Sequence, residues 1–138
     1  MKKIMIVDDN YLSAEGIEKN IDWETLNAEI IHVCYNGTSA IEAMKKEPAD
    51  LIISDIEMPD LDGISMSRQA LEINPMVKII LISAYDKFEY ARRALLLGAL
   101  DYIEKPLDYA YLIQKVKNAF ALMEKEQKNL QLLKQSRP

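Results

Sequence analysis

Residues 51–63 read LIISDIEMPDLDG, and this stretch decides the fold. It opens on a largely apolar run at residues 51–54, whose continuous, branched character is what a strand buried on both faces requires. Further runs of this kind lie at residues 4–7, 30–33, 77–83 and 102–103. The last of them is short and is bounded by turn residues. We expect each of these runs to be a strand.

Segments with helical periodicity separate the predicted strands. They lie at residues 12–20, 39–46, 64–73 and 87–97, and a final one begins at residue 108. Strict alternation of strand and helix is typical of an α/β fold, in which helices cover both faces of a parallel sheet.

The final helix predicts a boundary within the chain. Its apolar positions recur at spacings of three and four, which indicates a face that packs on the sheet: Leu112, Val116, Phe120 and Met123. Beyond them the segment is polar apart from Leu130 and Leu133, so we expect this part to protrude. We therefore assign residues 1–123 to one domain and residues 124–138 to a C-terminal helical extension.

Composition limits the class of protein. A length of 138 residues, with 49% hydrophobic and 28% charged residues, suits one globular domain. The net charge of −5 disfavours direct contact with a DNA backbone. No apolar run approaches the roughly 20 residues that cross a bilayer, and the lone cysteine, Cys34, suits a reducing compartment. We expect a cytoplasmic protein.

Polar residues follow four of the predicted strands: Asp8 and Asp9, Asp55, Ser83, and Lys105. Ligand sites in parallel α/β sheets form at these carboxyl ends. Three carboxylates against one ammonium leave a charge of about −2, which a divalent cation would neutralise. Because the ligands are oxygens, Mg²⁺ is favoured. The Asp55 carboxylate could then attack a phosphorus centre, with Ser83 and Lys105 binding the new oxygens.

Each of these residues has a simpler interpretation when taken alone. An Asp pair after a strand is more often a cap of the next helix. Asp55 shortly before Pro59 suits a turn, and a single Lys-Pro pair indicates little. Only the joint position of the residues at one edge of the sheet favours a functional site.

The combined pattern resembles the response-regulator receiver family of two-component signalling over nearly the whole chain. The matching motifs are Val7-Asp8-Asp9, Asp55 to Pro59 with Asp62-Gly63, Ser83-Ala84, and Asp101-Tyr102 through Lys105-Pro106. The resemblance implies a doubly wound, flavodoxin-like sheet of five parallel strands in the order 2-1-3-4-5, flanked by five helices. It also implies a signalling phosphoacceptor that is not an enzyme, and a sensor histidine kinase as its partner.

The resemblance also implies a role for each matching residue. Asp8 and Asp9 correspond to the acidic metal pair, Asp55 to the phosphoacceptor, and the backbone carbonyl of Glu57 to a further Mg²⁺ ligand. Ser83 is similar to the switch hydroxyl and Lys105 to its cationic partner. Tyr102 corresponds to the aromatic switch residue, and the bond before Pro106 is expected to be cis.

Two further stretches resemble, more particularly, receivers that precede AraC-type helix-turn-helix domains. They are residues 83–91, SAYDKFEYA, and residues 21–23, IDW. The resemblance implies control of transcription through an output domain that this chain does not contain. DNA would be contacted only by that domain.

In that family the readout surface combines the fourth helix, fifth strand and fifth helix, here residues 87–97, 102–103 and 108 onward. A turn of 100° per residue places one stripe of the fourth helix inward: Phe88, Ala91, Ala94, Leu95 and Gly98. Leu96 falls opposite, with Tyr90 and Leu97 at the margins. We expect a homodimer or partner contact there, although single exposed leucines are common. Leu130 and Leu133 offer a second contact, but Gln127 interrupts that seam.

Two other classes of function stay open at this point. A phosphohydrolase of the haloacid dehalogenase type also forms an aspartyl phosphate, but such enzymes usually have a second Asp where this chain has Glu57. A degenerate receiver that only binds proteins would not need the complete set of acidic residues and lysine.

Overall fold

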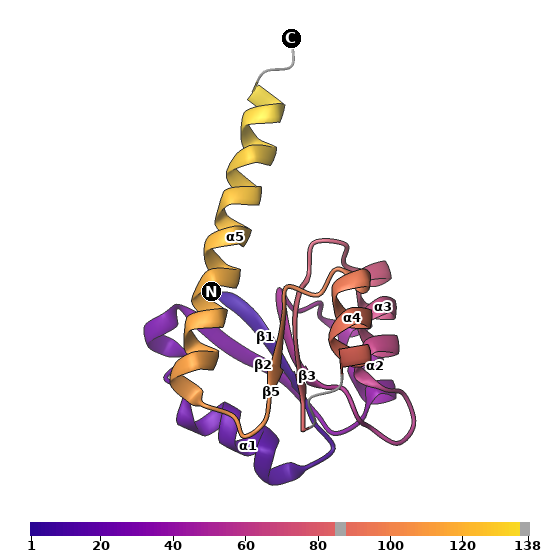
Figure 1. Cartoon of the computed structure of the whole chain (residues 1–138). Coiled ribbons are helices and arrows are strands. Elements are labelled where there is room, and N and C mark those ends of the chain that lie inside the picture. Colours follow the sequence, from indigo (N-terminus) through magenta and orange to yellow (C-terminus); the bar gives the residue numbers. More distant parts are fainter. Residues whose placement is uncertain (85–87, 136–138) are drawn as a thin grey trace.

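The structure is a computed structural model that describes residues 1–84 and 88–135 of the chain. Within these residues, five parallel strands form one sheet in the order β2-β1-β3-β4-β5 (Figure 1). The strands are β1 (Lys2–Val7), β2 (Ala28–Cys34), β3 (Leu51–Asp55), β4 (Lys78–Ser83) and β5 (Asp101–Glu104). This topology confirms the predicted strand order 2-1-3-4-5 and places β3 at the centre of the sheet.

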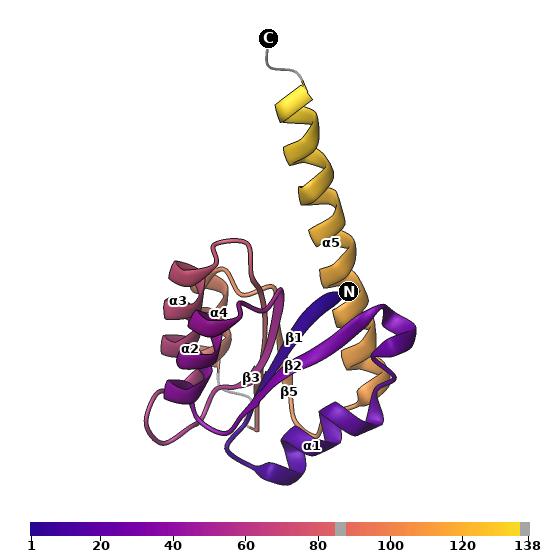
Figure 2. The ribbon, with the colours of Figure 1, turned by 180° about the vertical axis from the view of Figure 1, so that it is seen from behind.

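Helices cover both faces of the sheet (Figure 2). On one face lie α1 (Tyr11–Asn20) and α5 (Tyr109–Gln135), and on the other α2 (Gly37–Lys46), α3 (Gly63–Ile73) and α4 (Phe88–Leu97). A short 3-10 helix, η1 (Glu24–Leu26), joins α1 to β2. The flanking helices are therefore those that the sequence predicts. Among residues 1–84 and 88–135, every helix is too short or too polar to cross a bilayer.

Side chains of the central strand alternate between two apolar layers. Ile52 packs into the layer under α2, α3 and α4, whereas Leu51 and Ile53 pack into the layer under α1 and α5. Full burial of an aliphatic side chain of this size contributes about 1.5–3 kcal/mol. Burial on both faces explains why the strand-forming runs are continuously apolar.

Side-chain hydrogen bonds cap the N-termini of three helices, each of which follows a short loop. The cap hydrogen bonds run from Ser13 N to Asn10 Oδ1 (3.1 Å), Ser39 N to Asn36 Oδ1 (2.7 Å) and Ser65 N to Asp62 Oδ1 (2.8 Å). Asn10 is thus the N-cap of α1, and Asp8 instead accepts a hydrogen bond of 2.9 Å from Asn10 N. The interpretation of the Asp pair as a simple helix cap is therefore wrong.

The C-terminal helix packs on the sheet mainly along its first half. Leu112 and Val116 are fully buried, whereas Leu130 and Leu133 are 49% and 64% exposed. Figure 1 shows the second half of α5 extending beyond the body of the domain. Because the helix runs without a break through residue 123, the division into residues 1–123 and 124–138 stays a prediction.

The inward face of α4 differs from the predicted one. Ala94 is buried as expected, but Leu95, which the periodicity predicts to face inward, is 73% exposed. Tyr90 and Leu97 pack against the core instead. The side chain of Phe88 and residues 85–87 lie outside the described part of the chain. Helical spacing allows Ala94 to share an inward face either with Leu95 or with Tyr90, so periodicity alone cannot choose between these faces. Packing of α4 against α3 and β5 turns the face with Tyr90 towards the core.

Candidate functional site

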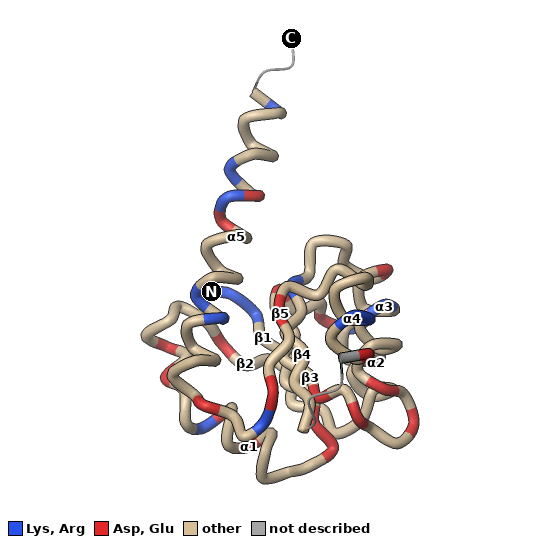
Figure 3. The backbone as a smooth tube through the Cα atoms, viewed as in Figure 1, with Lys and Arg blue, Asp and Glu red and all other residues tan. Residues whose placement is uncertain are grey.

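The carboxyl ends of the strands bring the predicted site residues to one edge of the sheet. Asp8 and Asp9 follow β1, while Asp55 and Ser83 are the last residues of β3 and β4. Figure 3 shows acidic positions gathered on the loops at this edge. Asp8 and Asp55 are buried, at 3% and 8% exposure, whereas Asp9 is exposed. Buried carboxylates at a strand edge need compensating charge.

Three carboxylates form a compact cluster at this edge. Oxygen atoms of Asp8, Asp9 and Asp55 all lie within 4.8 Å of one another. Burial, and then the charge of Asp8, raises the pKa of Asp55 to about 6. Burial also raises the pKa of Asp8. An all-oxygen cluster whose charge is disfavoured in this way fits a hard divalent cation such as Mg²⁺.

Lys105 supplies a positive charge next to the cluster. Its Nζ lies 3.6 Å from Oδ2 of Asp55 and 3.7 Å from Oδ2 of Asp8. The backbone N–H of Lys105 donates a hydrogen bond of 2.8 Å to the carbonyl of Ser83, which links the end of β4 to the loop after β5. The Lys105–Pro106 peptide bond is cis, the isomer that the resemblance implies.

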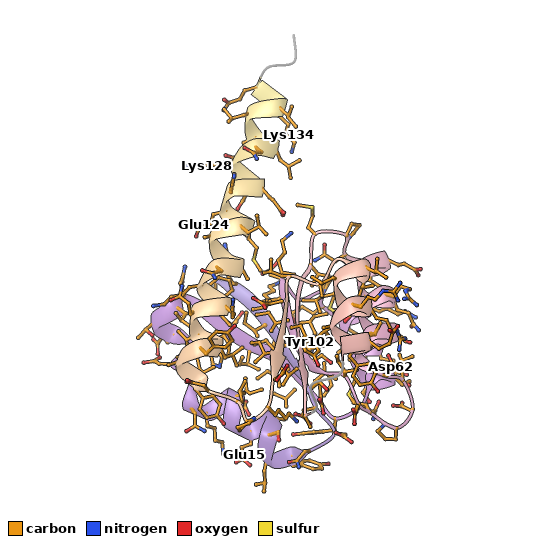
Figure 4. The ribbon with its side chains drawn as sticks, viewed as in Figure 1. Glu15, Asp62, Tyr102, Glu124, Lys128 and Lys134 are labelled. Atoms are coloured by element: carbon orange, nitrogen blue, oxygen red, sulfur yellow. The ribbon has the colours of Figure 1, made fainter. Side chains whose placement is uncertain are left out.

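The remaining predicted residues lie around this cluster. Ser83 is fully buried at the end of β4. Tyr102 on β5 is half-buried and packs against the core layer on the α4 side (Figure 4). Glu57 is half-buried in the loop after β3. These positions are compatible with the expected roles of the three residues, which stay predictions.

Gly63, at the start of α3, contacts the backbone of the phosphoacceptor candidate directly. A Cβ at Gly63 would collide with the carbonyl oxygen of Asp55 and lie 2.9 Å from Cα of Ile56. The N–H of Gly63 also donates a hydrogen bond of 2.8 Å to the carbonyl of Ile56. Only a residue without a side chain permits this approach. Sequence reasoning treated Gly63 as part of a motif and missed this role, because nothing local indicates the contact.

The fold and the site together define a receiver domain. The family model of the response regulator receiver domain matches residues 4–117, so the chain belongs to this family. It is therefore a signalling phosphoacceptor module and not a classical enzyme.

Individual relatives are transcriptional regulators. The chain is 29% identical to the transcriptional regulatory protein YesN of Bacillus subtilis over 91% of its own length and 34% of that protein. It thus spans about a third of that relative. Among solved structures, it resembles the receiver domain of the response regulator AraT from Geobacillus stearothermophilus (34% identity, TM-score 0.85, 91% of this chain and 98% of that one).

Two further solved structures are relevant to the regulation of transcription and to metal binding. A two-component transcriptional regulator AraC from Clostridium phytofermentans is 30% identical, with a TM-score of 0.82 over 94% of this chain and 99% of that one. A CheX–CheY complex with BeF₃ and Mg²⁺ from Borrelia burgdorferi is 29% identical, with a TM-score of 0.75 over 86% of this chain and 89% of that one.

Proposed function

We propose that this chain receives a phosphoryl group on Asp55 from a sensor histidine kinase, in a reaction that requires Mg²⁺. The observation that carries the proposal is the placement of Lys105 Nζ between Asp55 and Asp8, 3.6 and 3.7 Å from their Oδ2 atoms, beside the carboxylate cluster. The side chains of Asp8, Asp9 and Asp55 and the backbone carbonyl of Glu57 would hold the ion. Bound there, Mg²⁺ would offset negative charge on the transferring phosphoryl oxygens.

Asp55 is suited to act as the nucleophile. A pKa of about 6 leaves its carboxylate mainly ionised at neutral pH. The N–H of Ile56 donates a hydrogen bond of 3.0 Å to Oδ1 of Asp55, and Oδ2 faces Lys105. In the transfer, an oxygen of Asp55 forms the new bond to phosphorus while the bond from phosphorus to the donor nitrogen breaks, and Lys105 stabilises charge on the phosphoryl oxygens.

Phosphorylation would act on the rest of the domain through Ser83 and Tyr102. It replaces a charge of about −1 on Asp55 with roughly −1.5 to −2 and adds acceptor oxygens. We expect the Ser83 hydroxyl and Lys105 to bind these oxygens and Tyr102 to turn inward, which changes the surface of α4, β5 and α5. Leu95 and Leu96 of α4 are 73% and 74% exposed, so this surface offers an apolar contact for a homodimer. The exposed leucines of α5 offer a second one.

The phosphorylated domain would control transcription, and the protein would act in the cytoplasm. Support comes from the resemblance to YesN and to the Clostridium regulator. Because the chain spans about a third of YesN, DNA would be bound by a domain outside this chain, and we expect residues 124–138 to connect to it.

Intact-mass measurement tests the proposal. The protein is incubated with acetyl phosphate and Mg²⁺, and with EDTA in place of Mg²⁺, and its mass is compared with that of Asp55→Asn and of the control Asp60→Asn. Asp60 lies on an exposed loop, and its Oδ2 accepts a hydrogen bond of 2.6 Å from the Thr38 hydroxyl. We expect a gain of one phosphoryl group for the native chain and Asp60→Asn only with Mg²⁺, and no gain for Asp55→Asn. Labelling of Asp55→Asn would refute the assignment of the site.

A further inference from the structure

Ser54 stands directly before Asp55 in the central strand and follows the aliphatic residues 51–53. It is fully buried, and it pairs with Val7 of β1 on one side and with Leu81 of β4 on the other. A buried hydroxyl is unfavourable unless it forms a hydrogen bond. The Oγ atom of Ser54 donates a hydrogen bond of 2.8 Å to the backbone carbonyl of Asp55. The hydroxyl therefore acts on the backbone of the phosphoacceptor candidate.

The carbonyl that Ser54 holds belongs to the peptide unit that joins Asp55 to Ile56. A peptide unit is planar, so the direction of its carbonyl fixes the direction of its N–H. The N–H of this unit, on Ile56, donates to Oδ1 of Asp55 at 3.0 Å and also to the carbonyl of Ile82 at 3.0 Å. One rigid unit thus receives the hydroxyl of Ser54 at its carbonyl and holds a carboxylate oxygen at its N–H.

Packing alone does not give this carbonyl one orientation. A Cβ at Gly63 would lie 2.2 Å from the carbonyl oxygen of Asp55, so α3 packs directly against that oxygen. A contact of this kind excludes positions nearer to α3, but it does not attract the oxygen to any one of the others. A hydrogen bond is directional. The hydroxyl of Ser54 therefore adds the attraction that the contact with Gly63 lacks.

The two oxygens of the Asp55 carboxylate have different surroundings. Oδ1 accepts the hydrogen bond from Ile56, whereas Oδ2 lies 3.6 Å from Nζ of Lys105. Reaction with a phosphorus centre is fast only when the attacking oxygen is held in line with the bond that breaks. A carboxylate that rotates loses this alignment for part of the time.

We propose that Ser54 is a positioning residue for phosphoryl transfer, because its hydroxyl fixes the Asp55–Ile56 peptide unit and so keeps Oδ2 aligned for attack. The inference rests on the proposed function, in which Asp55 is the phosphoacceptor. Ser54 acts only through the backbone and does not contact the phosphoryl group. Loss of its hydroxyl should slow the transfer without removing the nucleophile, the lysine or a metal ligand.

A second buried serine provides a matched control. Ser67 on α3 is also fully buried, but its hydroxyl has no hydrogen-bond partner in the described part of the chain. Ser54→Ala and Ser67→Ala delete the same atom from equally buried positions, and only Ser54→Ala releases the Asp55 carbonyl. Ser54→Thr keeps the hydroxyl on a side chain that suits a strand. Intact-mass time courses with acetyl phosphate at saturating Mg²⁺ give the rate constant of labelling for each variant.

We expect Ser54→Ala to lower the rate constant about three- to tenfold, a change that corresponds to the net free energy of one hydrogen bond. Ser67→Ala should stay within about 1.5-fold of the native rate constant, since it removes no hydrogen bond. Ser54→Thr should retain at least about half of the native rate constant, because the donor is still present.

The amide proton of Ile56 gives a second readout that needs neither donor nor metal. Its NMR chemical shift reports the hydrogen bond to Oδ1 of Asp55. In Ser54→Ala this resonance should move upfield, because the peptide unit turns and the hydrogen bond lengthens. Ser67→Ala should leave the resonance in place, and Ser54→Thr should restore it. A role of Ser54 in stability alone predicts none of these differences.

Equal rate constants in Ser54→Ala and Ser67→Ala would overturn the inference, and so would an equal loss in Ser54→Ala and Ser54→Thr. An unmoved Ile56 resonance in a slow Ser54→Ala variant would also overturn it, because the loss would not pass through this peptide unit. Thermal melts establish that the variants are folded. If Ser54→Thr does not fold, Ser54→Cys replaces it, and its weaker S–H donor should give a rate constant between those of the native chain and Ser54→Ala. Failure of the native chain to label would instead overturn the proposed function.

Discussion

The Nζ atom of Lys105 lies 3.6 Å from Oδ2 of Asp55, although 50 positions separate the two residues in the chain. The distance is that of an ion pair without a direct hydrogen bond. Lys105 follows β5 and Asp55 ends β3, and β4 lies between these strands. The pair therefore spans the sheet edge and marks where a phosphoryl group would be received.

Replacement of Lys105 should slow phosphorylation. Lys105→Met keeps the aliphatic stem but removes the charge beside Asp55 and Asp8, so we expect labelling by acetyl phosphate to slow about tenfold or more. Lys115→Met is the control, because Lys115 pairs with Asp101 at 3.1 Å, away from the cluster. Equal rates in Lys105→Met and Lys115→Met would show that Lys105 does not stabilise the transferring phosphoryl group.

The raised pKa of Asp55 predicts a pH dependence of stability in metal-free buffer. Folding raises this pKa from 3.8 to about 6, so the folded state binds the proton more tightly than the unfolded chain. Stability should therefore fall as the pH rises from about 4 to about 6. Asp55→Asn cannot ionise, so its free energy of unfolding should exceed the native value by about 1–3 kcal/mol at pH 7 and by little at pH 4. Urea denaturation at both pH values checks this, and a gap that widens towards pH 4 would contradict it.

Mg²⁺ should stabilise the native chain through the carboxylate cluster. At about ten times its dissociation constant, a ligand adds about 1.4 kcal/mol, or about 4–6 °C in Tm for a domain of this size. Asp9→Asn removes a ligand from the exposed side of the cluster and should reduce this shift. Glu124→Gln changes an exposed carboxylate on α5, far from the cluster (Figure 4), and should keep it. Equal shifts in both variants would exclude Asp9 as a ligand.

Gly63→Ala should disturb the backbone of Asp55. The added methyl group would meet the Asp55 carbonyl and Cα of Ile56, neither of which can move freely. We expect a loss of about 1–3 kcal/mol in the free energy of unfolding. Gly16→Ala is the control, because the atom it meets is the hydroxyl at the far end of the Tyr109 side chain. Chemical denaturation measures both losses. Equal losses of unfolding free energy in Gly63→Ala and Gly16→Ala would show that the backbone contact at Gly63 does not restrict this position more than a side-chain contact does.

Leu96→Asp tests the association surface on α4. Leu96 is 74% exposed, so a charge there should not unfold the domain, but it should oppose an apolar dimer contact. We expect light scattering to detect more dimer after phosphorylation of the native chain and less in Leu96→Asp. Leu12→Asp changes a residue of α1 with 79% exposure and provides the control. Unchanged association states in Leu96→Asp would exclude this surface.

The sequence alone determined the strands, most helix boundaries and the residues of the carboxylate cluster. These features depend on neighbouring residues in the sequence. A strand that is buried on both faces is continuously apolar, and the residue that follows such a run lies at the carboxyl edge of the sheet. The runs at residues 4–7 and 51–54 therefore predicted β1 and β3, and with them the position of Asp8 and Asp55. Family resemblance supplied the strand order.

The tertiary structure decided the features that depend on neighbours across space. Periodicity allowed two inward faces of α4, and packing against α3 and β5 partly buried Tyr90 while leaving Leu95 exposed. The close approach of Gly63 to Asp55 also arises between segments that a loop joins. Local sequence encodes the period of an element, but its contacts depend on how the sheet and helices pack together.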